Sequence, residues 1–167
     1  MPKNPIYLLD ENVFIEAKNR YYAFDIAPPF WESLIDYSKR GFIQSIDLFK
    51  KKMEKYDDEL AEWIKAGNMS EAFMTTDQED VVAEYRGIVN WVQNNPQFNN
   101  AARATFANDP DGGLVAYAKA KDCIVITHET PKPAKSRVMI PNVCVQFKIP
   151  YRDTFQMMRE LGIRFKS

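Results

Sequence analysis

Acidic residues recur where a short apolar run ends or a helical pattern begins in this sequence. The acids at such points are Asp10, Asp47, Asp109, Asp111 and Glu129. Several carboxylates brought to one place repel one another unless a cation lies between them, and oxygen ligands suit Mg²⁺ or Mn²⁺. The sequence therefore predicts a divalent-metal site. An aspartate at a helix start is also a common helix cap, so Asp111 has a second, structural interpretation.

Three uncharged side chains lie close to these acids in the sequence. Asn12 has two candidate roles. Its amide can orient Asp10 from outside the metal site, or it can cap the next helix. Thr127 can hydrogen-bond a water or a phosphate oxygen. His128 is the single histidine of the chain, and we expect it to be a solvated turn residue rather than a catalyst.

The elements that must position these residues alternate between strand and helix patterns. Four short apolar runs predict strands at Ile6–Leu9, Phe42–Ile46, Cys123–Thr127 and Val143–Phe147. Apolar residues at helical spacing predict helices around residues 30–37, 60–64, 81–92 and 111–118. This alternation predicts an α/β protein with a central parallel sheet of about four strands flanked by helices. Ligands bind beyond the carboxyl ends of such strands, where the acids lie.

Length and composition favour one folded domain, residues 1–167. The chain is 46% hydrophobic and 27% charged, as is usual for globular proteins. Its longest apolar runs are only a few residues, so we expect no membrane span and a cytoplasmic location. Cys123 and Cys144 lie in apolar runs and are expected to be buried hydrophobes.

Charge is unevenly distributed along the chain. Residues 1–118 carry 12 positive and 19 negative side chains, whereas residues 119–167 carry 10 and 4. An acidic first part and a basic last part suit an enzyme that holds a cation and attracts a polyanion, although two solvated faces would give the same pattern.

Several segments resemble one known family. LLDENVFI, residues 8–15, resembles the LDxNVL signature that opens the PIN-domain nucleases, and residues 111–129, DGGLVAYAKAKDCIVITHE, are similar to the second half of that fold. Residues 15–34, 57–63 and 140–147 further resemble a bacterial and archaeal PIN-like family related to the toxins of toxin–antitoxin pairs.

The resemblance implies a PIN-like three-layer sandwich and a metal-dependent ribonuclease that cuts single-stranded RNA. In it, Asp10, Asp111 and Glu129 would hold Mg²⁺ or Mn²⁺, and the cation would activate a water without a histidine base. The family also implies RNA, a cognate antitoxin and a homodimer as partners.

Two residues depart from the family pattern. An ungapped comparison places Lys52 where the family usually has a glutamate ligand, and a lysine would repel a metal there. Either a nearby acid replaces that ligand, or the site binds metal weakly, or it is degenerate; the candidate acids are Asp47, Glu54 and Asp57. The second departure is Glu11, which either points outward or adds a carboxylate near the site.

Three other functions compete with the nuclease. Asp10 after a first strand suits a phosphate-accepting nucleophile, but the general acid expected two residues later is replaced by Asn12. A response-regulator receiver would need its acceptor aspartate on a central strand after paired acids, which Asp10 does not match. The third is a PIN-like RNA- or protein-binding module whose catalysis is weakened by Lys52.

Overall fold

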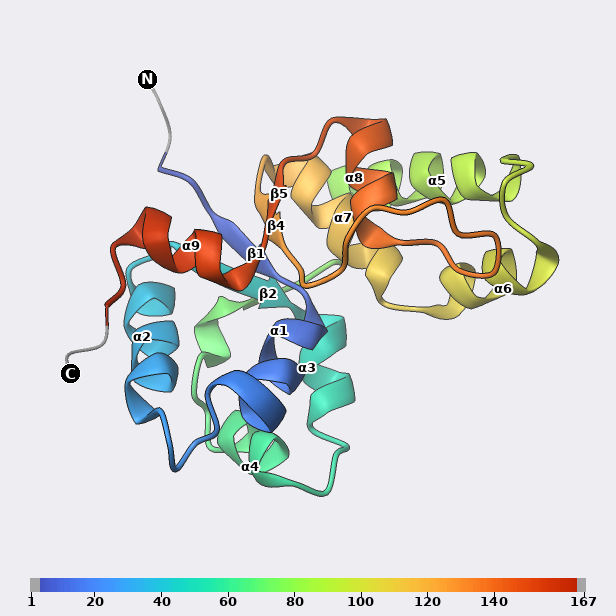
Figure 1. The fold of residues 1–167 in the computed structure, drawn as a ribbon. Helices are drawn as coiled ribbons and strands as arrows, with labels where there is room; N and C mark the ends of the chain where they lie inside the picture. The colour runs from blue at the N-terminus through green and yellow to red at the C-terminus, as the bar shows by residue number, and fades with distance from the viewer. Residues whose placement is uncertain (1–3, 165–167) are drawn as a thin grey trace.

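The sheet of the computed structural model, which describes residues 4–164, consists of five parallel strands in the order β3-β2-β1-β4-β5 (Figure 1). Their bounds are β1 Tyr7–Leu9, β2 Ile43–Ile46, β3 Phe73–Met74, β4 Ile124–Ile126 and β5 Tyr151–Arg152. The predicted α/β class and parallel sheet are confirmed, with one strand more than expected. Three of the four predicted strands correspond to β1, β2 and β4.

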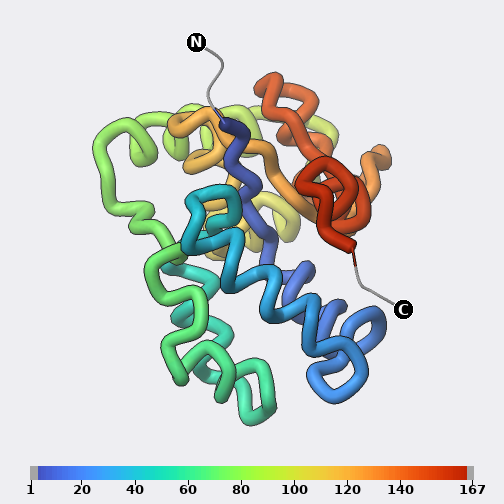
Figure 2. Tube along the Cα trace, turned by 90° about the vertical axis from the view of Figure 1, so that its left-hand side faces the viewer, coloured from blue at the N-terminus to red at the C-terminus, as the bar shows by residue number. Residues whose placement is uncertain are grey.

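The first strand lies at the centre because it pairs on both sides. Tyr7 is in register with Ile43 of β2 and with Ile124 of β4. After β1 the chain builds β2 and β3 on one side and then crosses to β4 and β5 on the other. Figure 2 shows this division, with the first strand between the green and the red segments. The reversal of strand order beside β1 is where α/β sheets bind ligands.

The predicted strand at Val143–Phe147 is wrong, since these residues belong to helix α8, Ile140–Phe147. Its buried apolar residues recur as Ile140, Val143 and Cys144, a spacing of one helical face. Val145, which a core strand would bury, is 64% exposed. Pro141 in the first turn suits the helix start.

Helices cover both faces of the sheet and its carboxyl edge. Their bounds are α1 Glu11–Glu16, the π-helix η1 Ala17–Tyr21, α2 Pro28–Lys39, α3 Asp47–Met53, α4 Glu59–Lys65, the 3₁₀ helix η2 Ser70–Ala72, α5 Glu79–Gln93, α6 Asn100–Asn108, α7 Asp111–Lys121 and α9 Thr154–Leu161. The four helices expected from periodicity are confirmed as α2, α4, α5 and α7.

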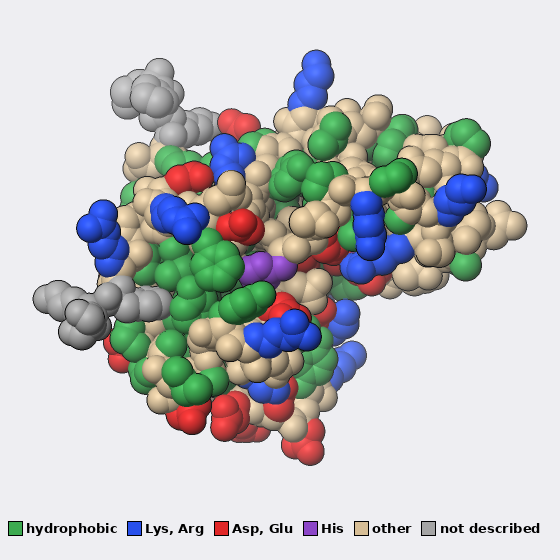
Figure 3. Space-filling view, in the orientation of Figure 1, with side chains coloured by type: hydrophobic (Ala, Val, Ile, Leu, Met, Phe, Trp, Pro, Cys, Tyr) green, Lys and Arg blue, Asp and Glu red, His purple; other side chains and the backbone are tan. Residues whose placement is uncertain are grey.

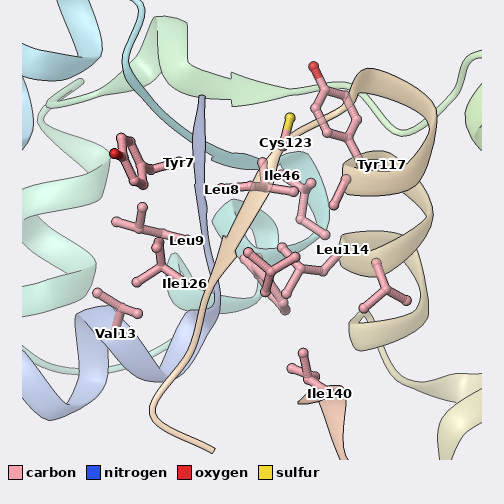
Figure 4. Packing of buried hydrophobic residues seen from close by; sticks show 14 of the residues in the cluster. Tyr7, Leu8, Leu9, Val13, Ile46, Leu114, Tyr117, Cys123, Ile126 and Ile140 are labelled. Atoms are coloured by element: carbon pink, nitrogen blue, oxygen red, sulfur yellow. The ribbon is translucent and has the colours of Figure 1, made fainter. Parts of the chain in front are cut away.

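Side chains of β1 alternate between the two faces. Leu8 points toward Leu114 of α7, whereas Tyr7 and Leu9 point to the opposite side (Figure 4). On that side the Tyr7 hydroxyl donates to Glu160 of α9 at 2.9 Å. Leu8 and Leu9 are both completely buried, which explains why the strand is continuously apolar.

Close packing of α7 on α5 fixes the start of α7, where Asp111 lies. A Cβ atom at Gly112 would lie 2.8 Å from a ring carbon of Tyr85 in α5. Any larger residue at position 112 would therefore have to displace the Tyr85 ring.

Two further expectations concern residues away from the site. Cys123 and Cys144 are buried free thiols, as predicted. Within residues 4–164, no helix is both long and apolar enough to cross a membrane.

Candidate active site

Asp10 lies at the carboxyl end of the central strand. Its backbone N–H donates to the carbonyl oxygen of Ile126 at 2.9 Å, which fixes it against β4. The Thr127 hydroxyl donates to the Asp10 carboxylate at 3.0 Å. Asp10 is the N-cap residue of α1, but its side chain makes no capping hydrogen bond. Asp10 as a whole is only 1% exposed, and its carboxylate is oriented by Thr127.

Asp111 is the first residue of α7, so the capping interpretation is wrong for it: the N-cap is Pro110. The Asp109 carboxylate accepts the backbone N–H of Asp111 at 2.9 Å. Asp109 therefore fixes the first turn of α7 and lies beside Asp111.

Glu129 follows β4 and is held by the start of α8. Its carboxylate accepts the backbone N–H of Ile140 at 3.1 Å and pairs with the Arg137 guanidinium at 3.0 Å. Its own N–H donates to the Thr127 hydroxyl at 3.1 Å. Thr127 thus connects Asp10 to the backbone of Glu129, whose side chain is 7% exposed.

The carboxylates of Asp10, Asp111 and Glu129 act on one another electrostatically. The pKa of Asp10 is raised to about 7, first by burial and then by the charge of Glu129. The pKa of Asp111 is raised to about 9, first by burial and then by the charges of Asp10 and Asp109. Buried acids without a compensating cation favour the neutral form in this way.

The oxygen-only donor set fits Mg²⁺ or Mn²⁺, and a cation would relieve this repulsion. Nevertheless, no three Asp, Glu, His or Cys side chains between residues 4 and 164 are already arranged to hold a metal ion. Among the three acids, Glu129 is the one held by a cationic side chain, Arg137. A cation that uses all three acids therefore competes with Arg137 for the Glu129 carboxylate.

The two departures from the family pattern are partners. The Lys52 ammonium lies 3.0 Å from the Glu11 carboxylate, which also accepts the Tyr56 hydroxyl at 2.6 Å. Glu11 is buried rather than pointing outward. Partial burial lowers the pKa of Lys52, but the hydrogen bond to Glu11 and the surrounding negative charges leave it raised. The charges of Asp109 and Asp111 raise it further, so α3 does face the acids.

The remaining predicted residues have different environments. Asn12 lies inside α1, whose cap is Asp10, so Asn12 does not cap that helix. Asp47 accepts the hydroxyl of Thr76 at 2.9 Å and its backbone N–H at 3.3 Å, which connects α3 to the segment before α5. His128 is half-buried, and its Nε2 lies 2.9 Å from the Thr154 hydroxyl. His128 lies in a bend after β4, as expected, but its ring is only partly solvated, and its lack of a catalytic role stays a prediction.

Arg137 was not singled out from the sequence. The only signal was its place in the basic last third of the chain, eight residues after Glu129. Figure 3 shows the molecule hollowed between the lobe of α1–α4 and the lobe of α5–α8, with acidic side chains inside and Lys and Arg on the rim.

Replacing Arg137 is expected to alter metal affinity modestly. In Arg137→Gln, a cation no longer competes with the guanidinium for Glu129, so Mn²⁺ affinity should rise by up to about fivefold, since an exposed ion pair contributes about 1 kcal/mol or less. Calorimetric titration with Mn²⁺ measures this. Lys135→Gln, in the same exposed loop, is the control, and equal affinities in all three proteins would contradict the competition.

Comparison with known proteins agrees with this architecture. The crystal structure of FitAcB from Neisseria gonorrhoeae is similar over 87% of this chain and 96% of that one, with a TM-score of 0.52 and 17% sequence identity. This likeness shows a shared PIN-like fold. A family model described as "Domain of unknown function (DUF4411)" matches residues 7–165. No curated protein sequence matches the chain.

Proposed function

This chain belongs to the DUF4411 family, and we propose that it is a divalent-metal-dependent endoribonuclease for single-stranded RNA and the toxin of a toxin–antitoxin pair. The observation that carries the proposal is the burial of Asp10 and Glu129 around the shared Thr127 hydroxyl, close enough to Asp111 for their charges to raise its pKa. A cognate antitoxin, a homodimer and a cytoplasmic location are parts of the proposal that rest on the family resemblance.

Burial of acids that repel one another is unfavourable for folding. Taking a carboxylate out of water costs free energy unless it is paired or neutralised, so acids kept this way usually have a functional role. Mg²⁺ or Mn²⁺ would allow all three acids to be charged at neutral pH. Asp10, Asp111 and Glu129 would be its ligands.

A bound divalent cation lowers the pKa of a water that it holds and neutralises charge that develops on the phosphate. The residues of the chain provide the positioning. Thr127 orients Asp10, Asp109 fixes the turn that carries Asp111, and the N–H of Ile140 accommodates Glu129.

Of the two basic side chains near the acids, Arg137 is the one placed to meet a polyanion. Arg137 is 54% exposed at the rim, so its guanidinium can contact a phosphate oxygen once Glu129 turns toward a cation. We do not assign His128 the role of base, because its Nε2 faces Thr154 rather than the acids.

The alternative is a PIN-like module that binds RNA or protein without efficient cleavage. It is favoured by Lys52, which contributes a positive charge where the family has a carboxylate, and by the absence of a finished three-ligand arrangement within residues 4–164. Metal binding distinguishes the two functions.

We expect Mn²⁺ binding to release protons. The pKa values of Asp111 and Asp10 are raised to about 9 and about 7, so the pair should hold between one and two protons at pH 7. A metal binds the ionised forms, so about one to two protons should be released per ion. Release should fall as the pH rises through the two pKa values. Titration calorimetry in buffers of different ionisation enthalpy counts the protons, and RNA cleavage in Mn²⁺ and in EDTA is measured in parallel.

Asp111→Asn is the matched variant, and it should release about one proton fewer. Failure of the wild-type protein to bind Mn²⁺, together with no RNA cleavage, would overturn the nuclease and favour the binding module.

A further inference from the structure

A second hollow adjoins the acids on the side of α1. Its volume is about 320 Å³, within the range of small-ligand pockets. It is lined by Asn12, Glu16, Arg20, Tyr21, His128 and Glu129. Because Glu129 belongs to both places, whatever occupies this hollow lies beside the proposed cleavage site.

One wall of the hollow is a single helical face. Asn12, Glu16 and Arg20 follow one another at intervals of four residues along α1 and η1. Glu16 and Arg20 form an ion pair at 3.3 Å, in which the Arg20 side chain is 72% exposed. The wall therefore offers an amide, a carboxylate and an accessible cation in a row.

The other feature is an aromatic surface. Tyr21, at the end of the π-helix η1, is 49% exposed. Its ring meets Phe155 edge-on at 5.5 Å and lies 5.8 Å from the ring of His128. In Figure 3 hydrophobic and acidic side chains lie around the histidine, with a basic side chain a little farther away. An exposed aromatic ring supported by other rings is a stable platform, and π-helical turns are frequent at functional sites.

We propose that this hollow, the Tyr21 subsite, holds one unpaired nucleobase of the RNA strand, next to the phosphate at the acids. The inference rests on the proposed function. Proteins recognise single-stranded RNA by stacking splayed bases on aromatic rings and by hydrogen bonds to the base edges. Tyr21 supplies the stacking surface, Asn12 and Glu16 supply donor and acceptor groups, and Arg20 attracts the flanking phosphate.

Binding of an end-labelled, single-stranded uridine oligonucleotide in Ca²⁺ tests the subsite without relying on cleavage. Fluorescence anisotropy should show that Tyr21→Ala raises the Kd about tenfold, because stacking on one aromatic side chain contributes roughly five- to 150-fold. Tyr21→Phe should remain within about twofold, since the ring is kept. Ile26→Ala, which alters another exposed apolar residue, 78% exposed, should change nothing.

A change in the RNA avoids any effect on folding of the protein. An abasic nucleotide is placed at each position in turn, and one position should weaken wild-type binding as much as Tyr21→Ala does. With the abasic nucleotide at that position, wild type and Tyr21→Ala should bind the RNA with equal affinity. The stacking role would be overturned if Tyr21→Ala and Tyr21→Phe weakened RNA binding equally. It would also be overturned if, at every position, the abasic nucleotide and Tyr21→Ala weakened binding additively.

The outcomes separate the two proposals. If wild type neither binds RNA in Ca²⁺ nor cleaves it in Mn²⁺, both proposals fail. If wild type cleaves RNA but Tyr21→Ala binds and cleaves like wild type, only the subsite fails. Loss of self-association in Tyr21→Ala with unchanged RNA binding would also overturn it, because the surface would then serve a protein partner.

Discussion

Asp10→Asn is expected to lower RNA cleavage in Mn²⁺ on the order of a thousandfold. Loss of a residue that only orients a metal ligand typically costs 10- to 100-fold, so loss of the most buried candidate ligand should cost more. Asparagine keeps the shape of the side chain and its contact with Thr127, but removes the charge that attracts a cation. Initial rates on a single-stranded RNA, measured with saturating Mn²⁺, give the effect.

The same variant is expected to be more stable than wild type without metal at pH 8. The folded-state pKa of Asp10, about 7, lies above the ordinary value of 3.8. Wild type therefore binds more protons when folded, and its stability falls as the pH rises from about 4 through about 7. Asparagine at position 10 removes that contribution, so the Tm difference between pH 5 and pH 8 should shrink.

The control for both measurements is Asp122→Asn. Asp122 is exposed and has a left-handed backbone with φ 58°, which asparagine tolerates. This variant should match wild type in rate and in Tm. If Asp10→Asn cleaves RNA at the wild-type rate, the assigned chemistry is wrong. A variant that is folded but inactive supports the assignment.

Lys52→Glu is expected to tighten Mn²⁺ binding about tenfold and to raise cleavage. Two unit charges 4 Å apart interact by about 4 kcal/mol at an effective dielectric of 20. The Lys52 side chain is 45% exposed, so solvent screening reduces this to a fraction. The substitution reverses a charge that acts on Asp109 and Asp111. Metal titration and an RNA cleavage assay measure both effects, with toxicity to the expressing cell as a further readout.

Two controls separate charge from position and packing. Lys51→Glu changes the same charge at the neighbouring exposed position of α3 and should have little effect. The double variant Glu11→Gln with Lys52→Gln removes both members of the ion pair and leaves the local net charge unchanged, so its Mn²⁺ affinity should stay near that of wild type. Equal affinity and rate in Lys52→Glu and wild type would show that this lysine does not influence the site.

Lys52 and Glu11, the two residues that depart from the family pattern, have to be interpreted together because they form an ion pair. Considered separately, a lysine in place of an acid indicates a damaged site, and an extra acid beside Asp10 has no evident use. Together they form a neutral pair at 3.0 Å. The positive charge of Lys52 is then largely balanced by Glu11 and acts less strongly on Asp111.

The sequence by itself determined the alternation of strands and helices and the places where acids leave them. Apolar runs such as the one before Asp10 and helical stripes such as Val81 to Val92 are local patterns, and a local period fixes which face each side chain occupies. Parallel pairing brings Asp10 and Glu129 to one edge of the sheet. Asp111, the first residue of α7, reaches them only through the packing of that helix.

Tertiary structure alone decided the edge strands and the partners of the charged groups. The strands β3 and β5 have two residues each, too few for a pattern, and they exist because neighbouring strands offer hydrogen bonds. The run of apolar residues in α8 is compatible with either a strand or a helix. It forms a helix because that conformation buries its apolar residues against the rest of the core. Lys52 and Glu11 lie 41 residues apart, and no local pattern encodes a contact between side chains brought together only by the folded chain.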